Sequence, residues 1–275
     1  MPVRCQPVSN LQLRLLTAAV GIPAIALLAW FGGWPFAIAA GIIAVLAAAE
    51  FIHGWLFPSL PIDMVAGQLP VAGVSGLMVA GTYKSPYFVV VGLAFTVLMA
   101  LMGYSRIVNS GPRKPYRVYA WSFLYTGLLM AAVVAVRVAD DGRAWFFLGL
   151  LATFAVDTGA YAVGKTFGRH RMAPSISPGK TWEGAAGGFV AGVGAVFALN
   201  ALFDTGVSLA VIAPVAVGLP VFAMAGDLFE SWMKRRMGVK DASGLLPGHG
   251  GFLDRLDSIL FVFPALFGYL WLFVL

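Results

Sequence analysis

The chain has 275 residues, of which 60% are hydrophobic and 11% are charged, and its formal net charge is +6. About a quarter of the residues in ordinary soluble domains are charged, so this composition excludes such a domain and indicates an integral membrane protein. The single cysteine, Cys5, excludes an intramolecular disulfide and a metal site built from cysteines.

Apolar runs long enough to cross a bilayer, about 20 residues each, recur along the whole chain. In hydrocarbon every backbone polar group must be satisfied internally, so we predict that these runs are helices. The expected fold class is all-α, a polytopic integral membrane protein with about nine transmembrane helices. The predicted spans are 11–31, 35–57, 65–83, 86–104, 118–138, 144–164, 182–203, 207–229 and 256–275.

The placement of lysine and arginine predicts the orientation of these helices in the membrane. If the N-terminus is cytoplasmic and the nine helices alternate, 15 of the 18 basic residues fall on the cytoplasmic side. The positive-inside rule therefore predicts a multi-pass protein of the inner (plasma) membrane with a cytoplasmic N-terminus. A basic cytoplasmic face suits anionic lipid head groups and phosphorylated ligands, so the net charge requires no nucleic-acid partner.

Acidic residues are divided unevenly along the chain. Only three of the twelve, Glu50, Asp63 and Asp140, precede residue 141. We therefore predict one membrane domain, 1–275, in which the helices of 1–117 serve as a scaffold and 118–275 is the catalytic half. Because it lies within an apolar span, Glu50 is interpreted as a satisfied interior acid rather than a site residue.

The segment 157–184 contains two features that resemble phosphate sites. "GAYAVGKT", residues 159–166, matches the P-loop pattern, but that loop requires a strand, a glycine-rich turn and a helix. Here the pattern continues an apolar span, so we reject that interpretation. In "SPGKTWEG", Ser177, Lys180 and Thr181 precede a helix predicted from 182, which is a suitable place for an anion. The alternative is ordinary capping by Thr181.

Three glycines, Gly184, Gly188 and Gly192, recur at every fourth residue of the next span. This spacing is typical of closely packed membrane helices, and we interpret it as structural.

The stretch 231–258 holds eight of the thirty charged residues. Its glycine-rich loop should fold back and bring Asp227, at the end of one span, close to Asp254 and Asp257 on one face of the last helix. Three converging carboxylates favour Mg²⁺, which takes oxygen ligands and shares them with substrate phosphates. Nearby basic residues would then bind phosphate. A Glu230–Lys234 ion pair is the structural alternative for part of this set, and Arg255 is the only basic residue beside Asp254 and Asp257.

The stretch from Ser231 resembles the signature of the phosphatidate cytidylyltransferases, also called CDP-diacylglycerol synthases. The segment 157–184 is similar to the same family, although Gly179 stands where many relatives carry a second lysine. The residues that match the signature, with its spacing, are Ser231, Lys234, Arg235, Lys240, Asp241, Ser243, Leu246, Pro247, His249, Gly250, Gly251, Asp254, Arg255 and Asp257.

The resemblance implies a nucleotidyltransferase that converts CTP and phosphatidate to CDP-diacylglycerol and pyrophosphate, with Mg²⁺ and a possible second cation. Phosphatidate would arrive from the bilayer and CTP from the cytoplasm, so the charges would gather where they meet. The implied site consists of metal ligands Asp227, Asp254 and Asp257; catalytic residues Lys180, Lys240, His249 and Arg255; and substrate-binding residues Asp157, Ser177, Thr181, Lys234, Arg235, Asp241, Gly250 and Gly251.

Several alternatives stay open at this point. One alternative is a related CTP-dependent transferase or a polyprenol kinase, which would act on another lipid. The motif does not identify the hydrocarbon chains of the lipid substrate. A transporter would also carry intramembrane acids, but transporter sites lie near the midplane between repeated halves. His249 has an alternative as a hydrogen-bonded loop histidine, and Asp157 as an organiser of the basic loop. The sequence does not decide the oligomeric state, and a homodimer is one possibility.

Overall fold

The computed structural model describes residues 10–56, 69–83, 115–246, 248 and 250–274. Most of the described chain is helical. The elements in chain order are α1 (Asn10–Phe31), α2 (Gly33–Leu56), α3 (Leu69–Gly81), α5 (Pro115–Ser122), the π-helical segment η2 (Phe123–Leu128), α6 (Leu129–Val138), α7 (Gly142–Phe167), β1 (Arg171–Ala173), β2 (Ser177–Thr181), α8 (Trp182–Phe203), α9 (Leu209–Met237), α10 (Leu253–Leu256) and α11 (Ile259–Phe273).

Helices occupy every predicted span that the structure describes, and the predicted span 86–104 lies outside the described residues. Within the described ranges, five helical segments are long and apolar enough to cross a membrane, and 19–31 and Ile259–Phe273 are shorter apolar helices. The helical, multi-pass class is thus confirmed, while the count of nine spans stays a prediction. The five long segments are Gly33–Leu56, Val118–Val138, Gly142–Phe167, Trp182–Phe203 and Leu209–Met237.

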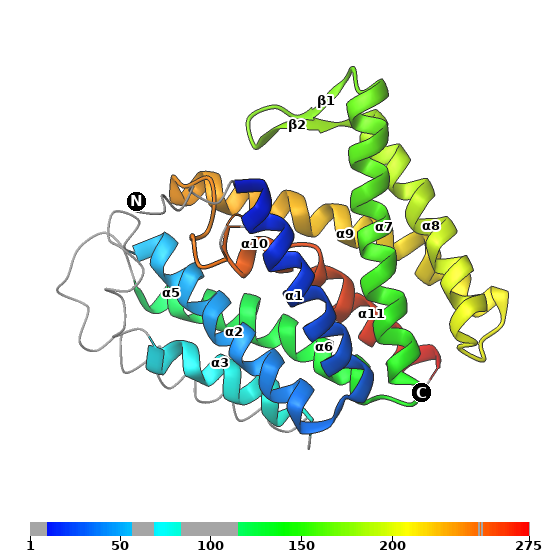
Figure 1. The fold of residues 1–275 in the computed structure, drawn as a ribbon, viewed down its shortest axis with the longest axis horizontal. Coiled ribbons are helices and arrows are strands. Elements are labelled where there is room, and N and C mark those ends of the chain that lie inside the picture. Colours follow the sequence, from blue (N-terminus) through cyan, green and yellow to red (C-terminus); the bar gives the residue numbers. More distant parts are fainter. Residues whose placement is uncertain (1–9, 57–68, 84–114, 247, 249, 275) are drawn as a thin grey trace, which may run out of the picture.

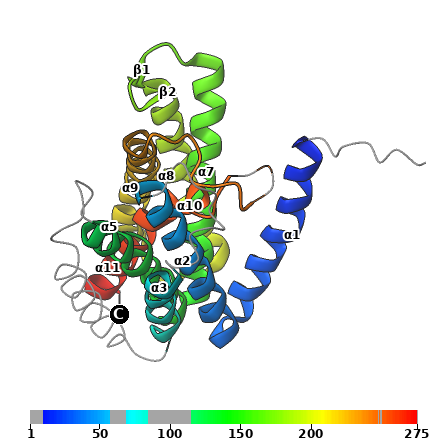
Figure 2. The ribbon, with the colours of Figure 1, turned by 90° about the vertical axis from the view of Figure 1, so that its left-hand side faces the viewer.

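The helices form two groups that α9 and α11 join (Figure 1). On one side α2 packs on α3, and η2 and α6 pack against both of them. On the other side α7 and α8 run as an antiparallel pair, and α9 packs against both members of this pair. Figure 2 shows α1 along the outside of the bundle, where it contacts α2 and α7. The core between the groups is apolar and includes Trp145, Ile212 and Phe263.

A two-stranded antiparallel hairpin joins α7 to α8, and the sequence did not predict it. Arg171 pairs with Thr181 and Ala173 with Ser177. Figure 1 shows the hairpin beside the ends of these two helices, at the top of the molecule. The lysine and hydroxyl residues of "SPGKTWEG" therefore belong to a strand, and Thr181 is the last residue before α8.

The helix predicted over 207–229 continues to Met237, eight residues beyond the predicted end. Asp227 therefore lies within α9 and not at its end, and the prediction of a helix boundary there is wrong. The physical reason is that basic residues suit the carbonyl end of a helix, and Lys234, Arg235 and Arg236 form the last turn. Gly238, with φ of +81°, then ends the helix in the left-handed conformation that glycine adopts without strain.

The last predicted helix is interrupted near its start. Asp254 lies in the one-turn helix α10, Asp257 follows it, and α11 begins at Ile259. The two carboxylates make different contacts: Asp254 accepts from the Gly251 amide, and Asp257 accepts from the Ser258 amide at 2.7 Å. The interruption corrects the predicted continuous helix, whereas joint action of the two aspartates on one ligand stays a prediction.

The close packing predicted for the glycines of α8 is confirmed. A Cβ atom at Gly188 would lie 2.8 Å from the Val156 carbonyl oxygen, and one at Gly184 would lie 2.9 Å from the Ala160 carbonyl oxygen. Both oxygens belong to α7, so the backbones of the two helices touch where side chains are absent.

We expect Gly188→Ala to destabilise the protein by about 1–3 kcal/mol, because the methyl group overpacks the α7–α8 interface. Gly194→Ala is the matched control on the same helix, since a Cβ atom there meets nothing within 4 Å. Thermal unfolding in detergent measures both variants. Equal melting temperatures for the two variants would contradict this account of the interface.

Candidate active site

A cavity of about 480 Å³ opens between the hairpin, α7, α8 and α9. Three carboxylates that are far apart in the sequence line it: Asp157 from α7, Asp227 from α9 and Asp257 from the turn before α11. We call this the carboxylate cavity. The other lining residues are Ala160, Tyr161, Gly164, Lys165, Arg171, Met172, Gly179, Lys180, Thr181, Gly184, Ala185 and Met224.

Lys180 connects the hairpin to the carboxylates. Its Nζ atom is buried and lies 2.8 Å from Asp227 Oδ1, as an ion pair without hydrogen-bond geometry. The carboxylates of Asp257 and Asp227 line the same cavity, where their negative charges repel each other. Like charges in one site disfavour ionisation of each other, so the carboxylate cavity is suited to a ligand that brings positive charge.

The donors in the carboxylate cavity fit Mg²⁺ by their chemistry. Among the residues that the structure describes, no three His, Cys, Asp or Glu side chains form a ready set of metal ligands. Mg²⁺ does not need such a set, because it usually binds through one or two carboxylates, substrate phosphates and water. Asp227 and Asp257 can supply those carboxylates from two sides, and Asp157 lines the same space.

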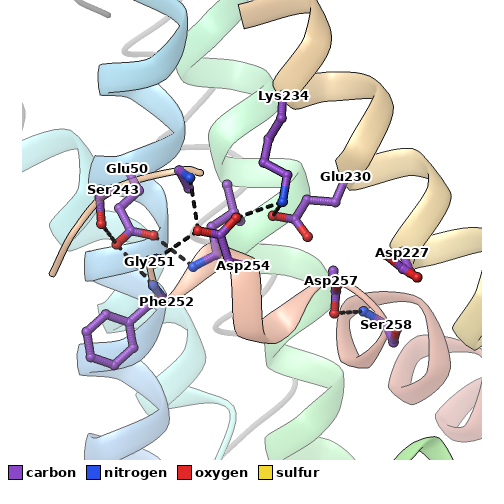
Figure 3. A network of polar contacts seen from close by, with 12 residues as sticks. Glu50, Asp227, Glu230, Lys234, Ser243, Gly251, Phe252, Asp254, Asp257 and Ser258 are labelled. Carbon is purple, nitrogen blue, oxygen red and sulfur yellow. Dashed lines mark hydrogen bonds and ion pairs between the residues drawn. The ribbon is translucent and has the colours of Figure 1, made fainter. Parts of the chain in front are cut away.

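Asp254 lies in a second polar group, which we call the Lys234 cluster: Glu230, Lys234 and Asp254. Lys234 Nζ lies 2.7 Å from Asp254 Oδ1 and 3.2 Å from Glu230 Oε1, and Glu230 is 1% exposed. Figure 3 shows Asp254 turned toward Lys234 and Gly251, whereas Asp257 lies on the side of Asp227. The predicted Glu230–Lys234 ion pair is confirmed, and Asp254 is a second partner that the sequence did not indicate.

The Asp254 carboxylate also organises the loop before α10. Its Oδ2 atom accepts the Ala242 and Gly251 amides at 2.9 and 2.7 Å. Burial raises the pKa of Asp254, but the hydrogen bonds from Lys234 and these amides outweigh it and hold the pKa below its usual value. The structure thus places Asp227 and Asp257 in one cavity, whereas Asp254 contacts Lys234 and the loop amides.

Residues around the hairpin fix its position on the helices. Thr181 accepts the Gly184 amide at 3.1 Å, so the capping alternative is confirmed, and the same residue lines the carboxylate cavity. Arg235, expected to bind substrate, donates from Nε to the Ile176 carbonyl at 3.0 Å and ties α9 to the turn between the strands. Ser177 lies in β2 opposite Ala173.

The residues of the glycine-rich loop and its flanks that were predicted to bind substrate or act in catalysis do not line the carboxylate cavity where the structure describes them. Gly250 has φ of +81°, and the Gly251 amide already donates to Asp254. Lys240 and Asp241 are exposed after the end of α9, Arg255 is exposed on α10, and none of the three lines the carboxylate cavity. His249 lies outside the described residues.

Three residues with polar side chains line the cavity but were not among the predicted site residues: Tyr161, Lys165 and Arg171. The lookalike "GAYAVGKT" is helical within α7, so rejection of a P-loop is confirmed. A helical period would have shown that Asp157, Tyr161 and Lys165 are four residues apart and share a face. Lys165 Nζ indeed lies 3.3 Å from the Tyr161 hydroxyl.

The fold and the site thus define a helical membrane protein in which carboxylates and basic side chains meet in one cavity. Residues 12–273 match the profile of the cytidylyltransferase family. The chain therefore belongs to this family.

Relatives with curated names agree with the family. The chain is 31% identical over 259 residues to the phosphatidate cytidylyltransferase of Staphylococcus aureus (strain COL), covering 93% of this chain and 97% of that protein. The enzyme of the same name from Staphylococcus haemolyticus is 30% identical over the same lengths. That of Mycobacterium bovis is 46% identical over 121 residues, which are 44% of this chain and 39% of that protein.

Proposed function

We propose that this protein is a membrane-embedded phosphatidate cytidylyltransferase, which converts CTP and phosphatidate to CDP-diacylglycerol and pyrophosphate. The observation that carries the proposal is the carboxylate cavity, where Asp227, Asp257 and Lys180 come together in a member of the cytidylyltransferase family. The named relatives that match over nearly the whole chain support phosphatidate as the acceptor.

The reaction joins two polyanions, and the chain supplies the groups to hold them. A phosphate oxygen of phosphatidate forms a bond to the α-phosphorus of CTP, the bond from that phosphorus to the bridging α–β oxygen breaks, and pyrophosphate leaves. Lys180 would bind phosphate oxygens and stabilise the developing charge, and Lys165 and Arg171 at the same cavity would help to bind the phosphates of CTP.

Mg²⁺ is the cofactor that we propose for the carboxylate cavity. Asp227 and Asp257 would hold it, with Asp157 beside them, and bound Mg²⁺ would neutralise phosphate charge. Apart from that contribution, the arrangement depends on side chains of this chain: the carboxylates fix one edge of the cavity, and Lys180 on β2 faces them from the other.

The test is transfer of label from CTP into lipid by the purified protein, with phosphatidate supplied or withheld. CTP labelled at the α-phosphorus should label the lipid only when phosphatidate is present, and CTP labelled at the γ-phosphorus should label only pyrophosphate. A CTP-dependent polyprenol kinase would give the opposite labelling with a polyprenol acceptor. Absence of both kinds of transfer would reject the proposed function.

We also propose that the cavity faces the cytoplasm, because the basic residues concentrate on that side of the predicted spans. A cysteine at Arg113 should resist an impermeant thiol reagent in intact cells, and one at Ser208 should react. Both would be made in a Cys5→Ser background, since Cys5 is the only native cysteine. The reversed labelling pattern would contradict the proposed orientation.

A further inference from the structure

Glu50 is a buried acid that the proposed reaction does not use. It lies on α2, in the half of the chain predicted to be scaffold, and it is 0% exposed. A carboxylate within an apolar helix is costly unless polar partners satisfy it. The prediction of a satisfied interior acid is confirmed, and its partners all come from the segment that carries the family signature.

Three donors converge on the Glu50 carboxylate (Figure 3). Oε1 accepts the Ser243 hydroxyl at 2.5 Å and the Phe252 amide at 3.0 Å, and Oε2 accepts the Leu253 amide at 2.8 Å. Ser243 and Phe252 lie on either side of the glycine-rich stretch, so one side chain of α2 holds both parts of the loop. These contacts span about 200 residues of sequence: 193 to Ser243 and 203 to Leu253.

The fit between Glu50 and the loop is close. A Cβ atom at Gly251 would lie 2.5 Å from Glu50 Oε2, so the loop backbone lies close against the carboxylate at this glycine. The amide of the same Gly251 donates to Asp254. Glu50 and Asp254 thus hold successive amides, 251 to 253, from two directions, and together they fix the start of α10.

The start of α10 determines where Asp257 lies. α10 is a single turn, Leu253–Leu256, and Asp257 follows it directly into the carboxylate cavity. A shift of the Phe252 and Leu253 amides would move this turn as a unit and displace the Asp257 carboxylate from Asp227. Such partners of ligand-bearing segments contribute to activity without touching the ligand.

We propose that Glu50 is a positioning residue for the cytidylyl transfer reaction, which sets Asp257 in the carboxylate cavity by holding the turn at Phe252 and Leu253. This inference rests on the proposed function for its kinetic consequence. It gives α2, from the first half of the chain, a part in catalysis. The negative charge is required because all three partners are donors and a carboxylate only accepts.

Glu50→Gln is the principal variant, because it keeps the size of the side chain and places an NH₂ group against one of three donors. We expect kcat to fall by about 10- to 100-fold, or the Mg²⁺ concentration for half-maximal activity to rise by a similar factor. Hydrogen exchange of peptides covering 250–258 should become faster. The Mg²⁺-dependent rise in melting temperature, measured without substrates, should shrink.

Ser122→Ala is the matched control. The buried Ser122 hydroxyl donates to the Ala48 carbonyl of α2 at 3.3 Å, so this variant also removes a buried polar contact of the same helix without touching the loop. It should leave exchange over 250–258 and the Mg²⁺ dependence unchanged. If Glu50→Gln does not fold, Ser243→Ala removes one donor and should give smaller changes of the same kind.

Two results would overturn the inference. In one, Glu50→Gln lowers the melting temperature while kcat, Mg²⁺ dependence and exchange over 250–258 stay at wild-type values, which would make Glu50 merely structural. In the other, Ser122→Ala and Glu50→Gln change all measurements equally. If the wild type fails to transfer cytidylyl groups, the proposed function is wrong, but the exchange measurements still decide whether Glu50 holds the turn.

Discussion

Asp257→Asn should lower turnover by about 100-fold or more and leave the protein folded, whereas Asp254→Asn should destabilise it by about 3 kcal/mol. The substitutions are chemically identical and only three residues apart, so the difference must come from their surroundings. Asp257 lines the carboxylate cavity beside Asp227. Asp254 accepts hydrogen bonds from Lys234, Ala242 and Gly251.

The expected stability of each variant follows from these contacts. Asn at 257 removes a charge that Asp227 opposes and still accepts the Ser258 amide, so the melting temperature should stay unchanged or rise. Asn at 254 removes one of the two carboxylates that pair with the half-buried Lys234. The expected destabilisation, about 3 kcal/mol, is at the low end of the range for breaking a buried ion pair, because Glu230 still pairs with Lys234.

Mg²⁺ separates the two roles independently of turnover. In the wild type Mg²⁺ should raise the melting temperature, because a ligand that binds only the folded state stabilises it. Asp257→Asn should lose most of this rise, and Asp254→Asn should keep it. A stable Asp254→Asn protein that has lost its response to Mg²⁺ would instead make Asp254 a metal ligand, as the sequence suggested.

The pattern of apolar spans predicted the helices well because the bilayer permits few alternatives. Every described span is helical, and the spacing of Gly184, Gly188 and Gly192 correctly predicted close packing against α7. In a membrane, the length and hydropathy of a segment determine whether it forms a spanning helix, and small residues allow two such helices to pack closely. Local patterns were therefore sufficient for them.

The distribution of acids between two clusters could not be predicted in the same way. Spacing placed Asp254 and Asp257 on one helix face, but it did not show that Asp254 pairs with Lys234 and two loop amides while Asp257 lines the carboxylate cavity. The choice depends on Lys234, which reaches Asp254 only because α9 continues past Asp227 to Met237. Similarly, nothing near Glu50 in the sequence indicates Ser243 or Leu253 as its partners. These contacts are set by tertiary packing.

Lys180→Ala should reduce turnover far more than Lys165→Ala, although both residues line the carboxylate cavity. Lys180 is half-buried and lies 2.8 Å from Asp227, so it faces the edge of the cavity where the carboxylates gather. Removing a cation that contacts the transferring phosphates should cost about 100-fold or more in kcat.

Lys165 is the control because it carries the same charge to the same cavity from an exposed position on α7, where its amine lies 3.3 Å from the Tyr161 hydroxyl. Exposed charges are well screened, so its loss should change KM for CTP more than kcat, by about tenfold or less. Melting temperatures of both variants should stay near the wild type, since Asp227 is 37% exposed and tolerates loss of its partner. Steady-state kinetics with varied CTP measures both parameters. A folded Lys165→Ala protein with the larger loss of kcat would place the transferring phosphates beside α7 and the Lys165 amine, away from the Lys180–Asp227 pair.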